Sequence, residues 1–342
     1  MNARRVDVAL DLPRMRHMSV GMRAYAEELA ARLPRVAPDL RFTTVVRTSA
    51  LDAGEQVALP LRLRRLRPRL VHHLAVYAPL LGPQPSIVTV HDLIHLRFPA
   101  LFKSRVGPYY ATVVRGVCAR AARVITDDER TIDDLERYLG VAPAKVAVVP
   151  LGVDELFLAT DVSPSGVRDT APYFLYVGNH RAHKDLPTLF SAWASLPQRY
   201  RVDLRLTGPD DLNGAARPER ANGELHFLGD VDARRLVSLY AGAVALVHPA
   251  LCEGFGLPLL EAAAVGTPVI ACRDAVPGVL RAHVAAFAPG DVAAARAHML
   301  AVLEKPAERE AARAVARRLT WDRCAERTAE VYRTVLEDSP VR

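Results

Sequence analysis

The sequence has few cysteines. Its 342 residues include four, Cys118, Cys252, Cys272 and Cys324, which are far apart and form no CxxC or Cys/His metal-binding spacing. A disulfide framework or a cysteine-based metal site is therefore not indicated, and the pattern favours free thiols in a reducing compartment.

Long hydrophobic runs are absent as well. No apolar stretch approaches the ~18 residues that a membrane-spanning helix needs. The first 18 residues contain Asp7, Asp11 and four arginines, so they lack the apolar centre of a signal peptide. We therefore predict a cytoplasmic protein, with a peripheral position at the inner face of the membrane left open.

Aromatic residues are scarce, at 6%, and no familiar nucleic-acid-binding motif is present, so a nucleic-acid partner is not expected.

Net charge is unevenly shared between the two halves of the sequence. Residues 1–165 hold 23 Lys and Arg against 17 Asp and Glu, a net of +6, whereas residues 166–342 hold 22 against 21, a net of +1. The basic first half favours an anionic acceptor or an anionic membrane surface as a partner.

The GxGxxG fingerprint of dinucleotide-binding enzymes is also absent, which weighs against a dehydrogenase. What the sequence does contain is an alternation of short apolar runs with helical patterns along almost its whole length. This alternation predicts an α/β fold of parallel sheets covered by helices on both faces. The predicted strands are 6–10, 42–46, 70–73, 87–90, 124–126 and 146–149, then 173–177, 202–206, 225–228, 245–247, 269–271 and 284–287.

The length of the chain suits two domains. Segment 161–170 is polar and contains Pro and Gly, so we predict a linker there between a domain of residues 1–164 and one of residues 165–342. In doubly wound domains, ligands bind outside the carboxyl ends of the strands. The predicted helices include 20–33, 104–121, 129–139 and a broken pattern over 307–336.

The most informative segment is EGFGLPLLE, from Glu253 to Glu261. It follows the strand predicted at 245–247 and contains a turn that leads into a helix expected over 255–265. Gly254 and Gly256 let the backbone approach a ligand closely, and a helix start suits a phosphate. The two carboxylates that flank this helix start are placed to accept hydrogen bonds from sugar hydroxyls.

A second polar segment follows the strand predicted at 173–177. Arg181, His183 and Lys184 cluster at a turn just before a helix that Asp185 is expected to cap. Cations ahead of a helix start suit a diphosphate, whose negative charge grows as it departs. Alone, this segment could equally be an exposed basic loop, and its pairing with EGFGLPLLE favours phosphate binding.

Together these segments resemble the donor site of retaining glycosyltransferases with the GT-B fold, particularly glycosyltransferase family 4. Members of this family carry G-R-x-x-x-x-K or G-N-x-R-x-x-K-N here, and Lys184 matches the lysine. Asn179 stands where many members have arginine, and Arg181 is the candidate to replace it. The resemblance implies two doubly wound, Rossmann-like domains facing a cleft, with a terminal helix from about residue 321 crossing back to the first domain.

The resemblance also assigns residues in the first half. Gly21 precedes a helix and is similar to the family's first glycine loop, which approaches the donor phosphates. His91 and Asp92 follow a buried strand and match an H-D pair whose histidine lies beside the reacting sugar. The alternative for His91 is a structural histidine paired with its neighbour Asp92.

The family's remaining donor contacts map onto the second half. The backbone between Leu228 and Val231 would bracket the nucleotide base, and the donor-binding turn comprises Gly254, Phe255, Gly256 and Leu257. The chain departs from the family where Asp127-Asp128 replaces a Ser-containing V-S-x-x-S run. Val276-Pro277-Gly278 likewise replaces a common P-E pair. Both changes are expected to affect donor or acceptor choice.

The expected function is therefore transfer of a hexose, with mannose or a related sugar favoured, from a GDP- or UDP-sugar with retention of configuration. Glu261 would hold the ribose, Glu253 the transferred sugar, and Lys184 with Arg181 the diphosphate. Neither a metal nor another cofactor is expected. The acceptor is expected to be a glycan, a lipid-linked sugar or a small molecule.

Two alternatives remain. One is another GT-B enzyme, either a sugar-nucleotide epimerase or a pseudo-glycosyltransferase that joins non-sugar units. The other is a catalytically silent binding subunit of a glycosylation complex. The joint presence of Glu253, Glu261, Lys184 and His91 disfavours the silent subunit.

Overall fold

The computed structural model describes residues 6–13, 18–47, 54–101, 106–159, 171–212, 217–218, 223–305 and 308–338. Its contacts divide the chain into two compact units, Met1–Gly152 with Thr320–Arg342, and Val153–Leu319. The division therefore lies before the linker expected at 161–170, which is outside the described residues.

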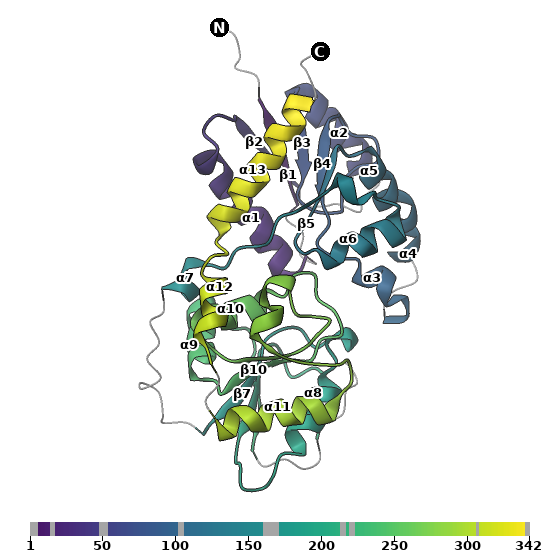
Figure 1. The fold of residues 1–342 in the computed structure, drawn as a ribbon. Helices are drawn as coiled ribbons and strands as arrows, with labels where there is room; N and C mark the ends of the chain where they lie inside the picture. The colour runs from purple at the N-terminus through teal and green to yellow at the C-terminus, as the bar shows by residue number, and fades with distance from the viewer. Residues whose placement is uncertain are drawn as a thin grey trace. The chain divides into compact units, whose positions relative to one another are not determined.

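The first unit contains a six-stranded, fully parallel sheet with the strand order β2-β1-β3-β4-β5-β6 (Figure 1). The strands are β1 (Val8–Pro13), β2 (Phe42–Arg47), β3 (Leu70–His73), β4 (Ser86–Thr89), β5 (Arg123–Thr126) and β6 (Val146–Val148). The helices are α1 (Val20–Val36), α2 (Glu55–Leu66), α3 (Ile94–Arg97), α4 (Val106–Tyr109), α5 (Arg115–Arg120), α6 (Arg130–Asp134) and α13 (Trp321–Asp338).

Alternating side chains of this sheet meet different helices, because successive residues of a strand point to opposite faces. On one face, Ala9, Val45 and Val71 pack against Leu59 and Leu63 of α2. These two leucines are four residues apart, as one helix face requires. The basic segment at 61–70 contains the end of α2 and leads into the buried strand β3.

The terminal helix α13 packs against α1 and β3 of the first unit. A buried chain of hydrogen bonds holds it there. Tyr332 of α13 contacts His72 Nδ1 at 2.6 Å, His72 Nε2 contacts Thr89 Oγ1 at 2.8 Å, and that hydroxyl also contacts Tyr25 of α1 at 2.8 Å. Arg32 of α1 adds an ion pair with Asp322 at 2.6 Å.

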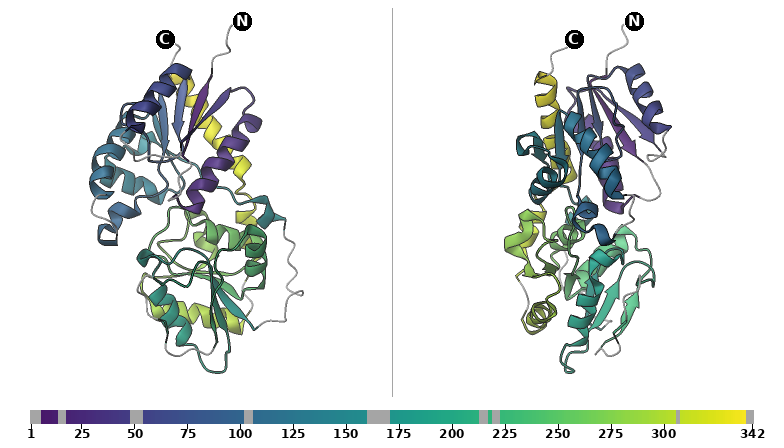
Figure 2. Two further views of the ribbon diagram at one scale, coloured as in Figure 1. Left: turned by 180° about the vertical axis from the view of Figure 1, so that it is seen from behind. Right: turned by 90° about the vertical axis from the view of Figure 1, so that its right-hand side faces the viewer.

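The second unit contains another six-stranded parallel sheet, ordered β12-β11-β10-β7-β8-β9. Figure 2 shows the ribbon from behind and from the side. The strands are β7 (Tyr173–Tyr176), β8 (Asp203–Leu206), β9 (Leu225–Phe227), β10 (Ala245–His248), β11 (Val269–Cys272) and β12 (Ala285–Phe287). The helices are α7 (Glu155–Leu158), α8 (Leu186–Ala194), α9 (Ala233–Gly242), α10 (Leu257–Val265), α11 (Val292–Glu304) and α12 (Glu310–Ala316).

The twelve predicted strands are all present, with ends shifted by up to a few residues. The helix expected over 104–121 is less regular, because a π-helical turn (Tyr110–Val114) separates α4 from α5, and residues 102–105 lie outside the description. A second π-helical turn (Leu135–Leu139) continues α6. Within the described ranges, no helix combines the length and apolar character needed to cross a membrane.

Candidate functional site

The topology of the second unit identifies where a ligand should bind. From β7 the chain builds β8 and β9 on one side, and it then returns to place β10, β11 and β12 on the other side. The strand order therefore reverses between β7 and β10, and doubly wound sheets bind ligands at the carboxyl ends beside such a reversal. The loop after β7 contains Lys184, and the loop after β10 contains Glu253.

The loop after β7 has a constrained backbone. Gly178 adopts φ 151°, and a Cβ there would lie 2.9 Å from the Tyr176 hydroxyl oxygen. A short 3-10 helix (Ala182–Lys184) follows, and α8 then begins at Leu186. Asp185 occupies the N-cap position but adopts a left-handed φ of 48°, and its carboxylate makes no hydrogen bond that caps the helix. It accepts one from the Thr188 hydroxyl at 2.7 Å instead, so the predicted cap was wrong in its contacts.

Lys184, which is buried, and Glu253, which is half-buried, form an ion pair through Lys184 Nζ and Glu253 Oε1. His248, the last residue of β10, contacts the same carboxylate oxygen through Nε2 at 2.7 Å. A backbone hydrogen bond of 2.9 Å from Leu251 to the His183 carbonyl joins the two loops. The structure thus brings together a lysine and a glutamate to which the sequence analysis assigned separate roles.

The environment of Glu253 favours its charged form. Burial raises the pKa of this carboxyl, but the Lys184 ammonium and the hydrogen bonds from His248 and Lys184 outweigh burial and hold the pKa well below its usual range. Glu253 is therefore ionised at neutral pH. Both protein contacts of this carboxylate use Oε1. The second oxygen, Oε2, makes no hydrogen bond within the described residues.

The environment of Glu261 has the opposite effect. This residue lies in the second turn of α10, which begins at Leu257, two residues later than predicted. Burial raises the pKa of Glu261 to about 7, against a hydrogen bond of 2.9 Å that Tyr240 donates to its Oε2. The two glutamates of EGFGLPLLE therefore have pKa values displaced in opposite directions, as is common in functional sites.

The turn that leads into α10 requires glycine at one position. Gly256 adopts φ 89°, and a Cβ there would lie 3.2 Å from the Ala275 carbonyl oxygen. Phe255 is buried, whereas Gly254 and Leu257 are half-buried. The turn thus places the start of α10 directly after Glu253, as an anion-binding helix start requires.

The segment that contains Leu228 and Val231 follows β9 and is tied to the loop after β8. Gly208 and Gly229 exchange two backbone hydrogen bonds of 2.9 and 3.0 Å. His180 connects the loop after β7 to the same region, since its Nε2 lies 2.9 Å from the Thr207 carbonyl. Three loops at the carboxyl ends of β7, β8 and β9 therefore form one connected rim.

Arg181 differs from Lys184 in its placement. It is exposed, and its backbone N–H donates to the Asn179 side-chain oxygen at 3.2 Å. Within the described part of the chain its guanidinium makes no ion pair, so the structure does not bring it into the Lys184–Glu253 cluster.

Sequence reasoning also missed His180 and His248, whose signal was a histidine near the end of a buried strand.

One Asp-x-Asp sequence, Asp230-Val231-Asp232, follows β9. The carboxylate of Asp232 caps α9 by accepting a hydrogen bond of 2.8 Å from the Arg235 backbone. Over the described ranges, no group of three or more His, Cys, Asp or Glu side chains is arranged to hold a metal ion.

In the first unit, His91 lies just beyond the carboxyl end of β4 and is buried. Its Nδ1 contacts Asp127 Oδ2 at 2.6 Å, and its Nε2 is buried with no hydrogen-bond partner in the described residues. Burial lowers the pKa of His91, but Asp127 outweighs it and the net pKa is raised. Asp92 instead accepts from the Ile94 backbone at 3.1 Å, so the partner of His91 is not its sequence neighbour.

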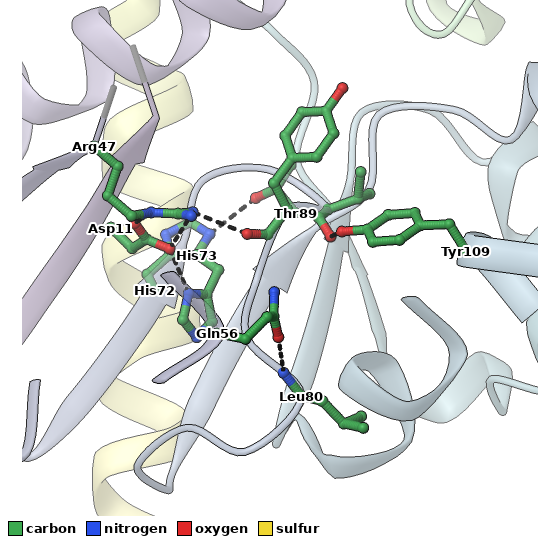
Figure 3. Close-up of polar contacts among 10 residues, drawn as sticks. Asp11, Arg47, Gln56, His72, His73, Leu80, Thr89 and Tyr109 are labelled. Carbon is green, nitrogen blue, oxygen red and sulfur yellow. Dashed lines mark hydrogen bonds and ion pairs between the residues drawn. The ribbon is translucent and has the colours of Figure 1, made fainter. Parts of the chain in front are cut away.

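A second polar cluster lies at the carboxyl ends of β1, β2 and β3, where the strand order of the first sheet reverses (Figure 3). Asp11 accepts hydrogen bonds from Arg47 at 2.8 Å and contacts His73 Nδ1 at 2.7 Å. Arg47 also donates to the Tyr77 carbonyl at 2.9 Å.

Gly21 lies in the first turn of α1, and the loop at 14–17 before it is outside the described residues.

Both parts of the sequence match known families. Residues 159–319 match the family described as "Glycosyl transferases group 1", and residues 18–155 match "Glycosyltransferase Family 4". The O-antigen chain mannosyltransferase B of Escherichia coli is 34% identical over 173 residues, which cover 47% of this chain and 45% of that protein. The D-inositol 3-phosphate glycosyltransferase of Streptomyces bingchenggensis is 31% identical over 277 residues, 72% of this chain and 61% of that protein. The chain thus aligns with about half to three fifths of the length of these relatives.

Solved structures share the fold at low sequence identity. A sucrose-phosphate synthase from Thermosynechococcus elongatus has a TM-score of 0.72 at 19% identity, with 98% of this chain and 100% of that one covered. Anabaena Alr3699/HepE in complex with UDP and glucose has a TM-score of 0.70 at 15% identity, with 95% and 99% covered. With its two six-stranded parallel sheets and these matches, the chain belongs to the group 1, or family 4, glycosyltransferases of the GT-B fold.

Proposed function

We propose that this glycosyltransferase moves a hexose from a nucleoside-diphosphate sugar with retention of configuration and without a metal ion. The observation that supports it most is the largely desolvated Lys184–Glu253 pair at the strand-order reversal of the second sheet. This pair places a cation for a diphosphate beside a carboxylate for a sugar hydroxyl, directly before the start of α10. A similar mannosyltransferase favours mannose, and a structure of the same fold with bound UDP favours a UDP-sugar, with a GDP-sugar as the second candidate donor.

Each donor contact has a proposed partner in the second unit. Lys184 binds the diphosphate and stabilises its charge as it departs, with exposed Arg181 available to a second phosphate oxygen. Glu261 accepts hydrogen bonds from the ribose, and the backbone of 228–231 brackets the base. Glu253 orients the transferred sugar through the free Oε2 and stabilises positive charge that develops on its ring.

The first unit is proposed to serve the acceptor and the reacting sugar. His91 presents its unpartnered Nε2 to a sugar hydroxyl, and Gly21 approaches the donor phosphates. The acceptor is a glycan, a lipid-linked sugar or a small molecule. The basic charge of the first half suits contact with an anionic membrane surface at the cytoplasmic side.

A donor screen tests the proposal. Purified protein is heated with GDP-, UDP- and dTDP-sugars, and a bound donor should raise the unfolding temperature, since ligand at 100-fold excess over Kd stabilises the folded state by about 2.7 kcal/mol. The stabilising donor is then incubated with candidate acceptors, and release of nucleoside diphosphate is measured.

The outcomes separate the alternatives. A glycoside product with retained configuration supports the proposal, whereas an altered free sugar nucleotide indicates an epimerase. A coupled product without a sugar acceptor indicates a pseudo-glycosyltransferase. Donor binding without nucleoside diphosphate release, across a broad acceptor panel, would point to a silent binding subunit and overturn the enzymatic proposal.

A further inference from the structure

His248 contacts Glu253 but is itself fully buried. Its ring stacks on Tyr176, with 5.9 Å between the ring centroids and 12° between the planes. One ring nitrogen, Nε2, lies 2.7 Å from Glu253 Oε1, whereas the other, Nδ1, is buried without a hydrogen-bond partner in the described residues. A histidine in this position can reach Glu253 but cannot itself meet a ligand from solvent.

The contacts define the proton on this ring. Glu253 is a carboxylate and can only accept, so Nε2 must be the nitrogen that donates. A second proton on Nδ1 would create a buried cation with an unpaired N–H, which is costly. Burial and the nearby Lys184 ammonium also lower the pKa of His248. His248 is therefore a neutral imidazole with its proton on Nε2.

The arrangement changes if Lys184 binds a diphosphate. Lys184 Nζ and His248 Nε2 share one oxygen of Glu253, so the carboxylate has two partners without a ligand. A lysine that turns toward phosphate oxygens weakens or gives up its contact with Glu253. The Glu253 side chain is only 14% exposed, so its carboxylate would be destabilised if it were left with no partner. His248 is the remaining donor that can hold it.

We propose that Lys184 exchanges Glu253 for the donor diphosphate, and that His248 is the positioning residue that keeps Glu253 ionised and in place during this exchange. The proposal rests on the proposed function, since it takes the diphosphate as the ligand of Lys184. It makes His248 important for nucleotide affinity and for turnover, although His248 touches neither nucleotide nor sugar.

Three substitutions test the exchange by calorimetric titration with GDP and UDP. His248→Phe keeps a flat ring on Tyr176 but removes the donor, so it should weaken binding roughly tenfold, because Lys184 would then leave an unpaired buried carboxylate. His248→Gln retains an N–H donor and should restore most of the affinity. Glu253→Gln releases Lys184 from its ion pair and should tighten nucleoside diphosphate binding.

The decisive measurement is the double variant. In the Glu253→Gln background no carboxylate can be left unpaired, so adding His248→Phe should weaken binding no further. A packing role for His248 would instead produce the same loss in both backgrounds, and that result would overturn the proposal. Exposed His283, substituted to Phe, is the matched control, and circular dichroism checks that every variant is folded.

Two further readouts separate this inference from the proposed function. Nitrogen NMR of histidine-labelled protein should find the His248 proton on Nε2 with and without nucleotide, and a proton on Nδ1 would contradict the inference. If wild-type protein binds neither GDP nor UDP, the proposed function and the exchange fall together. If it binds them and His248→Phe binds equally well, the function stands and the inference is wrong.

Discussion

At the scale of single residues, the two glutamates of one short motif have opposite electrostatic environments. Glu253 is held ionised by Lys184 and His248, whereas Glu261 has a tyrosine hydroxyl and no cation within hydrogen-bond distance in the described residues. The difference arises because Glu253 lies in the loop after β10, next to the loop that contains Lys184, while Glu261 lies inside α10. Their substitutions should therefore have different consequences.

Lys184→Ala should reduce turnover and donor affinity. Removing a cation from a reacting phosphate costs on the order of 2–4 kcal/mol, or roughly 10²-fold or more in rate. Initial rates and donor titrations measure both effects. Lys145, which donates to the Ala119 carbonyl in the first unit, is a suitable control. Turnover like that of the wild type in a folded Lys184→Ala protein would refute the assignment.

Glu261→Gln should make stability less dependent on pH. The folded-state pKa of about 7 lies above the ordinary value of 4.5, so the protonated form contributes stability that is present below pH 4.5 and lost as pH rises through 7. The variant cannot ionise and should be more stable than the wild type at pH 8, with a smaller difference at pH 5. Calorimetric unfolding between these pH values measures this, and a difference that does not vary with pH would contradict it. Nucleotide binding should weaken in the variant.

Asp127→Asn should impair His91. The asparagine carries no charge to stabilise a protonated ring, so burial would be opposed by Asp92 alone and the pKa of His91 would fall. Its ring proton could also move to the other nitrogen. Turnover should drop roughly tenfold, because the hydrogen bond that orients the His91 ring toward the reacting sugar would be weakened. NMR titration of His91 measures the pKa directly, and Asp128→Asn is the control because Asp128 pairs with Arg130 at 2.7 Å. An unchanged pKa would be inconsistent with the Asp127 contact.

At the scale of secondary-structure elements, the position of α13 depends on polar contacts as well as packing. The hydrogen-bonded chain through Tyr332, His72, Thr89 and Tyr25 connects α13 to β3, β4 and α1. Each member is buried, so each loss leaves a neighbour unsatisfied. The docking of the terminal helix is therefore specific to this surface.

Tyr332→Phe should lower the free energy of unfolding by about 1–3 kcal/mol, because His72 Nδ1 would be buried without its partner. Chemical denaturation followed by fluorescence measures the change. Tyr109→Phe is the matched control, since its hydroxyl makes only a long contact of 3.4 Å with the Val76 carbonyl. Equal losses in the two variants would show that the buried network has no special weight.

At the scale of the whole molecule, the proposed chemistry relies on protein charge instead of a metal. Lys184 and the start of α10 provide the positive potential that a departing diphosphate needs. The net charge of +7 also favours anionic ligands in general. Membrane or acceptor binding through this charge should weaken with salt.

EDTA should leave the transferase activity essentially unchanged. If Lys184 and helix dipoles stabilise the leaving group, chelation of divalent ions removes nothing that the reaction uses. The assay compares initial rates with excess EDTA and after addition of Mg²⁺ or Mn²⁺. Loss of activity that either ion restores would overturn the metal-independent mechanism and leave the fold assignment intact.

Sequence periodicity was sufficient for the strands of this protein. The twelve strands follow from short apolar runs, and the start of α8 at Leu186 follows from a polar turn and a proline. Local motifs also indicated Lys184, Glu253, Glu261 and His91, because carboxyl ends of parallel strands are where such folds bind ligands. These inferences need only neighbouring residues.

Only the tertiary structure decided which of these residues meet. Lys184 and Glu253 are 69 residues apart, and His91 and Asp127 are 36 apart, so their contacts depend on the order of strands in each sheet. The same order buries His248 against Glu253 and joins Asp11 to Arg47 and His73. The pKa values follow from those contacts and from burial, which are properties of the folded chain and not of any local pattern.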